Sequence, residues 1–373
     1  MKILLVANTS WFLVNFELPL IKEFQAKKWD VVAVVPKDEW TSNLEKLGVT
    51  VRDVTVNRRG LNPFLDVVLC FRLYQMYKQE KPDAVFHNTI KPVIYGSLAA
   101  RFADSKSVLN MIPGLGYVFA GDKFINKLLQ PLVRSLYKYA LSNSRIVYFQ
   151  NPDDRDYFVS RSLVPQDKAE VTFGLGVDLN HFQYSPPVDK NGECIFLLVA
   201  RMLWDKGVGE FVEAAKVIRN RFPKATFQLL GRIDSGNPNH VTKETIDEWV
   251  RAGYIQYLGE VSDVRSIVEH ADVVVLPSYY REGIPNSLME AMAMGRPIIT
   301  TDMPGCRETI IGNRNGVLIP PKNIEALIDA MKLLLEHPDR RIEMGKQGRS
   351  IAVERFNVDR VNSMILSAIR DAR

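Results

Sequence analysis

The sequence predicts an α/β protein with two doubly wound domains, each a parallel sheet covered by helices. First, strand-like apolar runs alternate with amphipathic helical segments along the whole chain, as is typical of parallel strands buried on both faces. Second, a length of 373 residues suits two domains better than one. Third, the polar, Pro-containing segment QYSPPVDKNGE at 183–193 interrupts the alternation. We therefore expect domains at 1–185 and 186–357, and a last helix at 358–373 free to pack on either domain, including back across the first.

The strand-like segments share a core of aliphatic residues that ends at polar or turn-forming ones. They read KILLVA, DVVAVVP, VTVRDVTV, DAVFHN, SVLNMI and RIVYFQN in the first half, and CIFLLVAR, TFQLLGR, YIQYLGE, DVVVLPS, RPIITTD and NGVLIPP in the second. Helix-patterned segments lie between them, among them FELPLIKEFQAKK, FLDVVLCFRLYQMYKQE and VIYGSLAARFA. Open parallel sheets bind ligands beyond the carboxyl ends of their strands, so the loops after these strands are the candidate sites.

Composition and charge narrow the class of protein. The chain is 46% hydrophobic and 24% charged, and its N-terminus MKILLVANTS lacks the features of a signal peptide. Cys70, Cys194 and Cys306 stand far apart and in no metal-ligand spacing, which favours reduced thiols in a cytoplasmic protein. Residues 58–145 hold 13 basic against 5 acidic side chains, so we expect an anionic partner near the first domain. Nucleic acid is disfavoured because the chain has no recognised nucleic-acid-binding motif.

Two cations follow the strand CIFLLVA. Arg201 and Lys206 stand between that strand and the helical segment VGEFVEAAKVIRNRF. Arginine offers paired planar donors and lysine a point charge, so together they suit a diphosphate. The alternative is a pair of solvated surface charges.

The segment REGIPNSLMEAMAMGRP at 281–297 predicts a helix that begins at a ligand site. Pro285 suits a first helical turn, and Asn286 and Ser287 favour helix starts. The free N–H groups of that turn would attract phosphate, and Gly283 would let a ligand approach the backbone.

Two glutamates bracket this helix start. Glu282 precedes it and Glu290 stands on its second turn. Carboxylates beside a phosphate site are useful where they accept hydrogen bonds from sugar hydroxyls, which suggests a sugar nucleotide. The alternative is a helix-dipole partner and a solvated helix residue. Further loops point to the same ligand: Glu308 follows the Gly-containing turn MPGCRETI, and YLGEVSD at 257–263 offers backbone groups for a flat base.

These motifs occur in an order that resembles the retaining GT-B glycosyltransferases of family 4. The landmarks are GVDLNHF, VARMLWDKG, LLGR, YLGEVSDV, LPSYYREGIPNSLMEAMAMGRPIITTDMPGCRE and NGVLIPP. The resemblance implies two Rossmann-like domains facing a cleft, with a nucleotide-diphosphate sugar held by the second. It assigns Arg201 and Lys206 to the diphosphate, Glu290 to the ribose hydroxyls and Glu282 to the transferred sugar. The remaining implied donor-side residues are Glu308, Gly283, Asn286, Ser287, Leu288, Val261 and Gly231.

The first domain also resembles a subgroup. NTIKPVIYGSLAARF at 88–102 and MIPGLGYVF at 111–119 are similar to bacterial enzymes that extend a sugar on polyprenyl diphosphate, such as N-acetylgalactosaminyltransferases of glycan assembly. The acceptor-side candidates are His87, Lys91 and Gly114. Many relatives carry a histidine in the loop after the fifth strand, whereas this loop reads NMIPGLG. His87 lies one strand earlier, and it either reaches the cleft or is a structural histidine.

The resemblance also implies a mechanism. Configuration would be retained, and the leaving phosphate would itself take the proton of the acceptor hydroxyl. Cations near that phosphate would stabilise its growing charge. The only Asp-x-Asp, at 154–156, begins a predicted helix and is interpreted as helix capping, so no metal is expected to be required. Uridine is favoured over guanosine as the base.

Two segments suggest contact with a membrane. KFINKLLQPLVRSLYKYA at 123–140 mixes cations with apolar residues at near-helical spacing, and NRRGLNPF lies at 57–64. They would rest on anionic lipid and place the protein at the inner face of the cytoplasmic membrane. The alternative is a core-packing helix with a basic outer face.

Three other functions are alternatives to a glycosyltransferase. A sugar-nucleotide epimerase would share the architecture but need no acceptor. A nicotinamide oxidoreductase is disfavoured because the first turn, ANTSWFLVN, lacks G-x-G-x-x-G. A non-catalytic sugar-nucleotide binder is the third alternative.

Overall fold

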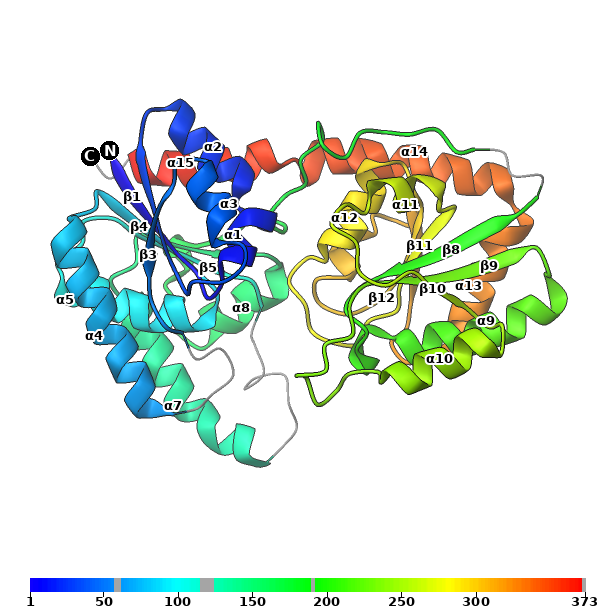
Figure 1. The fold of residues 1–373 in the computed structure, drawn as a ribbon, viewed down its shortest axis with the longest axis horizontal. Helices are drawn as coiled ribbons and strands as arrows, with labels where there is room; N and C mark the ends of the chain where they lie inside the picture. The colour runs from blue at the N-terminus through cyan, green and yellow to red at the C-terminus, as the bar shows by residue number, and fades with distance from the viewer. Residues whose placement is uncertain (57–61, 115–123, 189–191, 371–373) are drawn as a thin grey trace. The chain divides into compact units, whose positions relative to one another are not determined.

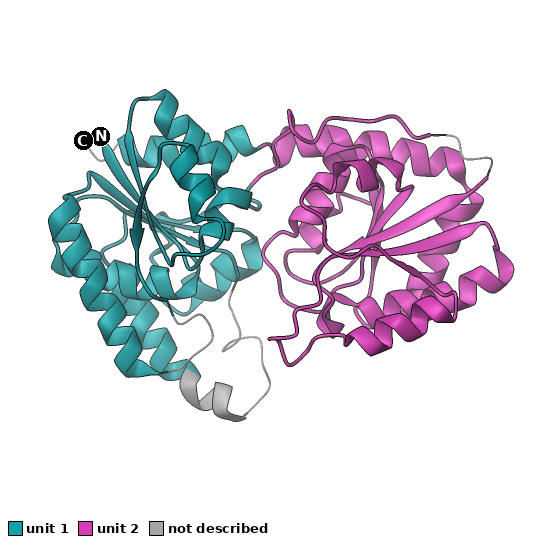
Figure 2. Cartoon of the chain, in the orientation of Figure 1, with its two compact units in different colours: residues 1–175, 358–373 teal, residues 176–357 magenta. Residues whose placement is uncertain are grey.

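The computed structural model describes residues 1–56, 62–114, 124–188 and 192–370. The chain divides into two compact units: residues 1–175 with 358–373 form unit 1, and residues 176–357 form unit 2 (Figure 2). The sequence places the boundary near residue 186, ten residues after this division. Within the described part of the chain, no helix is both long enough and apolar enough to cross a membrane.

Unit 1 contains a seven-stranded parallel sheet in the order β3-β2-β1-β4-β5-β6-β7 (Figure 1). The strands are β1 (Lys2–Val6), β2 (Asp30–Val35), β3 (Thr50–Asp53), β4 (Ala84–Asn88), β5 (Val108–Ile112), β6 (Ile146–Phe149) and β7 (Ala169–Val171). The helices are α1 (Ser10–Phe16), α2 (Leu18–Ala26), α3 (Thr41–Lys46), α4 (Pro63–Glu80), η1 (Pro92–Gly96), α5 (Ser97–Phe102), α7 (Phe124–Leu141), α8 (Pro152–Ser160), η2 (Gln166–Lys168) and α15 (Val358–Arg370).

Alternate residues of each strand enter opposite cores of unit 1. Ile3 and Leu5 face the core formed with α1, α2, α3 and α15, whereas Leu4 and Val6 face the core formed with α4 and α5. Because successive strand residues point to opposite faces, a strand covered on both sides must be apolar throughout. The last helix, α15, belongs to unit 1, and the hydroxyl of Tyr148 in β6 donates to the carbonyl of Met364.

Unit 2 contains a six-stranded parallel sheet in the order β10-β9-β8-β11-β12-β13. The strands are β8 (Cys194–Val199), β9 (Ala225–Leu230), β10 (Gln256–Tyr257), β11 (Val273–Leu276), β12 (Ile298–Thr301) and β13 (Gly316–Ile319). The helices are η3 (Trp204–Lys206), α9 (Val208–Arg221), α10 (Lys243–Arg251), α11 (Arg265–His270), α12 (Asn286–Ala293), η4 (Arg307–Thr309), α13 (Ile324–Glu336) and α14 (Pro338–Arg355).

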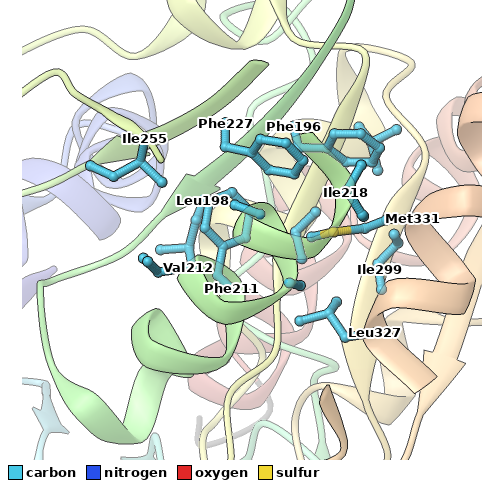
Figure 3. Close-up of a cluster of buried hydrophobic side chains, with 14 of the residues drawn as sticks. Phe196, Leu198, Phe211, Val212, Ile218, Phe227, Ile255, Ile299, Leu327 and Met331 are labelled. Carbon is cyan, nitrogen blue, oxygen red and sulfur yellow. The ribbon is translucent and has the colours of Figure 1, made fainter. Parts of the chain in front are cut away.

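The main core of unit 2 lies between its sheet and the helices α9 and α13 (Figure 3). Phe196 of β8 stacks on Phe227 of β9 with ring centroids 5.3 Å apart, and Phe211 of α9 meets Phe227 edge to face. Leu327 and Met331 of α13 close the same cluster. These rigid elements hold the strand ends from which the candidate site projects.

All twelve strands expected from the sequence are present, and β7 is an additional one. The strand order also locates the switch points of the two sheets. In unit 1 the order reverses between the neighbouring strands β1 and β4, and in unit 2 between β8 and β11. Ligands of doubly wound folds bind beyond the carboxyl ends of the strands at such points.

Candidate active site

The loops that follow β8 and β11 are joined by hydrogen bonds. The carbonyl of Asp205 accepts from the backbone N–H groups of Tyr279 (3.0 Å) and Tyr280 (3.2 Å), and from the hydroxyl of Ser278 (3.1 Å). Gly207 follows with φ +78°, and a Cβ there would lie 2.2 Å from the carbonyl oxygen of Pro277. Only glycine therefore lets the two loops approach this closely.

Lys206 and Glu282 form an ion pair at this junction. Nζ of Lys206 lies 2.5 Å from Oε2 of Glu282, and the two side chains are only 12% and 13% exposed. The other carboxylate oxygen of Glu282 accepts a 2.9 Å hydrogen bond from the hydroxyl of Ser278. The structure thus brings together Lys206, assigned by the resemblance to the diphosphate, and Glu282, assigned to the transferred sugar, and both oxygens of the carboxylate are held.

A turn at 304–308 supports the loop that carries Glu282. The backbone N–H of Glu282 donates to the carbonyl of Pro304 (3.2 Å). Gly305 has φ +89°, and a Cβ there would lie 1.6 Å from the carbonyl oxygen of Gly283. The side chain of Glu308 accepts from the backbone N–H of Gly305 at 2.7 Å, so Glu308 stabilises the turn against which Glu282 and Gly283 rest.

Cys306 belongs to the same turn and is fully buried. Burial, followed by the charge of Glu282, raises the pKa of its thiol to about 12. Cys306 is therefore protonated at neutral pH and acts as a packing residue beside the Lys206–Glu282 pair.

The first turn of α12 presents free backbone donors. Pro285 is the N-cap, and no side chain caps the helix. Among the described residues, nothing accepts from the N–H of Asn286 or of Ser287. The N–H of Leu288 donates to the carbonyl of Pro285 and its side chain is fully buried, so Leu288 packs the helix in place. Two free donors at a helix N-terminus attract an anion.

Glu290 lies on the second turn of α12 and is mostly buried. Burial raises the pKa of its carboxyl group to about 7. No hydrogen bond or ion pair joins this carboxyl group to any residue that the structure describes. It is thus a poorly solvated acceptor on the helix whose first turn carries the two free N–H donors.

Arg201 lies in the same loop after β8 as Lys206, but it pairs with Asp234 and not with Glu282. Its guanidinium lies 2.9 Å from Oδ2 of Asp234, and 46% of the side chain is exposed. Gly231 follows β9 and donates its N–H to the carbonyl of Gly259 at 2.7 Å. Val261 lies two residues further along that loop and is exposed. These residues line the ends of β8, β9 and β10 beside the switch point.

His87 is a structural residue of unit 1. It is fully buried; Nδ1 donates to Oδ1 of Asn110 (2.9 Å), and Nε2 accepts from the hydroxyl of Tyr77 (3.0 Å). Burial lowers its pKa to about 4, and Gly96 packs directly on the ring. Of the two readings that the sequence left open, this geometry fits the structural one.

Lys91 forms an ion pair with Asp66. Its Nζ lies 2.5 Å from Oδ1 of Asp66, whose other oxygen accepts from the hydroxyl of Tyr95 at 3.0 Å. Gly114 lies two residues beyond β5, and the rest of its loop, at 115–123, falls outside the described residues. The described residues therefore place neither Lys91 nor Gly114 beside the candidate donor-binding residues.

Sequence reasoning did not single out Asn88 and Thr89, which end β4 at the switch point of unit 1. Both side-chain amide atoms of Asn88 and the hydroxyl of Thr89 are buried with no partner among the described residues. Thr89 also has φ +73°, a strained conformation for a β-branched residue. Orphan polar groups and backbone strain cluster at functional sites. In the sequence these two residues stand at the polar end of β4 (AVFHN) and directly after it.

Metal ligands are not grouped in the described part of the chain: no cluster of three or more His, Cys, Asp or Glu side chains could hold an ion there. Asp154, part of the Asp-x-Asp at 154–156, is buried in the first turn of α8, where its backbone N–H donates to the side chain of Asn151. Asp154 therefore serves the start of that helix.

Comparison with known proteins identifies the family. The family model described as "Glycosyl transferase 4-like" matches residues 2–151, and "Glycosyl transferases group 1" matches residues 183–351. A Campylobacter jejuni protein named "N,N'-diacetylbacillosaminyl-diphospho-undecaprenol alpha-1,3-N-acetylgalactosaminyltransferase" is 30% identical over 365 residues, which cover 95% of this chain and 94% of that protein. An Escherichia coli protein named "UDP-Gal:alpha-D-GlcNAc-diphosphoundecaprenol alpha-1,3-galactosyltransferase" is 25% identical over 385 residues, covering 94% and 95%.

The fold is shared with solved structures as well. Anabaena HepE in complex with UDP matches over 100% of both chains with a TM-score of 0.79 at 16% sequence identity. The fold of HepE agrees with the two parallel sheets of this chain. The matched families agree with the order of motifs along its sequence. The chain therefore belongs to the GT-B glycosyltransferases of the 4-like and group 1 families, and it is a glycosyltransferase.

Proposed function

We propose that this enzyme transfers a hexose or N-acetylhexosamine from a UDP-sugar, with retention of configuration, to a glycan carried on polyprenyl diphosphate. The observation that carries the proposal is the 30% identity, along nearly the full chain, to a protein named for transfer to a diphospho-undecaprenol-linked sugar. The E. coli relative is named for UDP-galactose and an acceptor of the same kind. The product would belong to a surface polysaccharide or a protein glycan.

The donor is assigned to unit 2. Lys206 and the free N–H groups of Asn286 and Ser287 project from the strand ends at the switch point, and they would bind the diphosphate. Glu290 would accept from the ribose hydroxyls, and Glu282 from the transferred sugar. The solved HepE structure contains UDP, which supports a uridine donor for a chain of the same fold.

The chemistry follows from this placement. The bond between the anomeric carbon and the diphosphate oxygen breaks while the acceptor hydroxyl forms the new bond, and the acceptor proton passes to the leaving phosphate oxygen. Negative charge grows on that phosphate, and Lys206 with the α12 N–H groups would stabilise it. Glu282 is already engaged by Lys206 and Ser278, so we do not assign it as a nucleophile.

Retention is supported by the linkage in the relatives' names. Both are named for forming an α-1,3 bond. Common UDP-hexoses carry their sugar in the α configuration, so an α product from such a donor preserves the configuration.

The acceptor also suggests where the enzyme works. A polyprenyl chain stays in the bilayer, so an enzyme that extends its glycan must reach the membrane surface. We propose peripheral association with the inner face of the cytoplasmic membrane, supported by the 13 basic against 5 acidic residues of 58–145. Residues 57–61 and 123 of the two segments that suggested lipid contact lie outside the described residues.

Product analysis tests the proposal. The purified enzyme is incubated with each of several UDP-sugars and a polyprenyl-diphosphate-linked monosaccharide. Mass spectrometry then identifies the extended acceptor, and proton NMR gives its anomeric configuration. Parallel reactions with a chelator test metal independence. Conversion of the UDP-sugar to its epimer without acceptor would support an epimerase instead, and tight binding of donor without any product would support a non-catalytic binder.

A further inference from the structure

The solvent-facing side of α4 begins with a group of exposed apolar side chains. Five such residues occur within eight positions, and we call them the α4 apolar face: Phe64, Leu65, Val67, Val68 and Phe71. Phe64 is 81% exposed and Phe71 is 57% exposed. Soluble proteins rarely leave so many large apolar side chains together in water, and such patches mark interaction surfaces.

This face is not an unpacked part of the core. Leu69, Leu73 and Tyr77 lie on the opposite side of α4 and are buried against the sheet. Farther along the exposed side of the helix the residues become polar, with Arg72, Gln75, Lys78 and Gln79. On α4, the helix labelled in Figure 1, the exposed apolar side chains therefore lie in the first turns.

The charges around the α4 apolar face suit an anionic lipid surface. Asp66 is the one acidic residue within 64–71, and its carboxylate turns away from solvent to pair with Lys91 and Tyr95. Arg72 flanks the face on the helix, and Arg58 and Arg59 precede it in the sequence. Cations around exposed aromatic and aliphatic side chains are typical of segments that enter the headgroup region of a bilayer.

We propose that the α4 apolar face inserts shallowly into the lipid bilayer and holds the enzyme at the membrane. The proposal deepens the proposed function, on which it rests for the lipid-linked acceptor. A second copy of this chain would also cover an apolar face. Arg72 on the helix, the two arginines that precede α4 in the sequence and the single, inward-turned acid favour lipid instead.

Vesicle binding by the full chain, without donor or acceptor, tests the proposal. The vesicles contain phosphatidylcholine mixed with phosphatidylglycerol, and co-sedimentation gives the bound fraction. We expect the triple variant F64S/V67S/F71S to lose binding at least about tenfold. The matched control V217S/V250S/V353S removes three exposed valines of unit 2 and should bind as the unmodified protein does. Because all six side chains are exposed, both variants should fold.

Two readouts separate insertion from surface attraction. Salt screens charge but not apolar burial, so the fraction that stays bound at high salt should vanish in the F64S/V67S/F71S variant. A tryptophan at position 64 (F64W) should shift its emission to the blue on vesicle binding and be quenched by brominated lipid. A tryptophan at position 217 (V217W) should show neither effect.

Several outcomes would overturn the proposal. These are the absence of vesicle binding by the unmodified protein, equal binding by F64S/V67S/F71S, or self-association in ultracentrifugation that this variant abolishes while vesicle binding persists. The proposed function is judged separately, by transfer to a short-chain, water-soluble acceptor, which F64S/V67S/F71S should carry out normally. If the unmodified enzyme transferred sugar to none of the acceptors, the proposed function would be wrong. The vesicle-binding result would not be affected.

Discussion

Nζ of Lys206 lies 2.5 Å from Oε2 of Glu282, across the two loops that meet at the switch point of unit 2. The pair is largely shielded from solvent, so each charge is oriented by the other. Lys206 retains further N–H donors for a phosphate, and Glu282 is held by Ser278 as well. In the proposed function these two side chains are therefore already oriented before a ligand arrives, which would lower the cost of reorganisation during the reaction.

Replacing Lys206 with alanine should lower kcat by about 10²–10³, because it removes the cation that we propose stabilises the leaving phosphate. The matched control is Lys216→Ala. Lys216 pairs with Glu213 at 2.7 Å on the surface of α9, and its removal should leave kcat unchanged. Steady-state kinetics on variants with intact circular dichroism provide the measurement. Near-normal turnover by folded Lys206→Ala protein would refute the diphosphate assignment.

Glu282→Gln should keep the hydrogen bond from Ser278 but lose the ion pair, so we expect kcat to fall about as far as in Lys206→Ala. Groups that act together are not additive. The double variant Lys206→Ala/Glu282→Gln should therefore be little worse than either single one. Additive losses in this double-mutant cycle would show that the two side chains act independently.

Glu290→Gln should produce opposite effects on stability and on donor binding. The folded-state pKa is raised to about 7 from 4.5, so the native carboxyl holds its proton longer than the unfolded one. Stability is therefore lost as pH rises from about 4.5 to 7 and stays lower above that. The variant should be more stable at about pH 8, by at most about 3 kcal/mol, and unchanged near pH 4.5. Thermal unfolding across this range tests it.

Donor affinity should follow the ionisation of Glu290. A carboxylate accepts ribose hydroxyls better than a carboxylic acid does, so calorimetry should show UDP binding strengthening as pH rises through about 7. Glu290→Gln should abolish that dependence. Glu17→Gln is the control: burial raises the pKa of Glu17 to about 8, so its replacement should also stabilise at alkaline pH, but without changing UDP affinity. A pH dependence that survives in Glu290→Gln would contradict the ribose assignment.

Gly305→Ala should damage the donor loop. The new Cβ would meet the carbonyl oxygen of Gly283, which must then move together with Glu282. Gly312→Ala is the control, because Gly312 also has positive φ but has open space around it. The control should cost about 1 kcal/mol from backbone strain alone, and Gly305→Ala clearly more. Differential scanning calorimetry and UDP titration measure both effects; equal losses would show that the close approach is unimportant.

His87 should make stability depend on pH without affecting donor binding. Its folded-state pKa is lowered to about 4, so the unfolded chain binds a proton at higher pH than the native one. Stability is then fully present above about pH 6.5 and is lost as pH falls toward 4. Urea unfolding between these values should show the loss, and His87→Gln should reduce it. A His87→Gln enzyme that folds but no longer transfers sugar would point instead to a role at the acceptor.

Some of the fold could be read directly from the chain. The run CIFLLV of β8 and the other central strands are apolar at nearly every position, as both-face burial requires. The edge strands β3 (TVRD) and β10 (QY) are polar and partly exposed. The three residues of β7, AEV, include a glutamate and were too short to stand out. The seven-residue helix α1 was missed for a similar reason, because Ser10–Phe16 is too short to repeat an apolar pattern.

The sequence predicted which residues belong to the candidate site but not the contacts between them. The sequence grouped Lys206, Glu282 and Glu290 near one ligand, because each directly follows a strand or lies on the helix after it. It did not pair Lys206 with Glu282, or Arg201 with Asp234, since these partners come from different loops. Asn88 and Thr89 were passed over because their missing partners are visible only once the neighbouring side chains are placed.

Local pattern determined most of the strands and helices of this protein, although not the short β7 and α1. A strand buried on both faces needs apolar residues throughout, and a helix packed on one side needs an apolar stripe. The sequence also determined the family, since the order of its motifs survives in the chain. Only the tertiary structure decided which strands are neighbours, and therefore that the loops after β8 and β11 meet. Contacts between residues as distant in sequence as Lys206 and Glu282 depend on strand order and register, which no local pattern encodes.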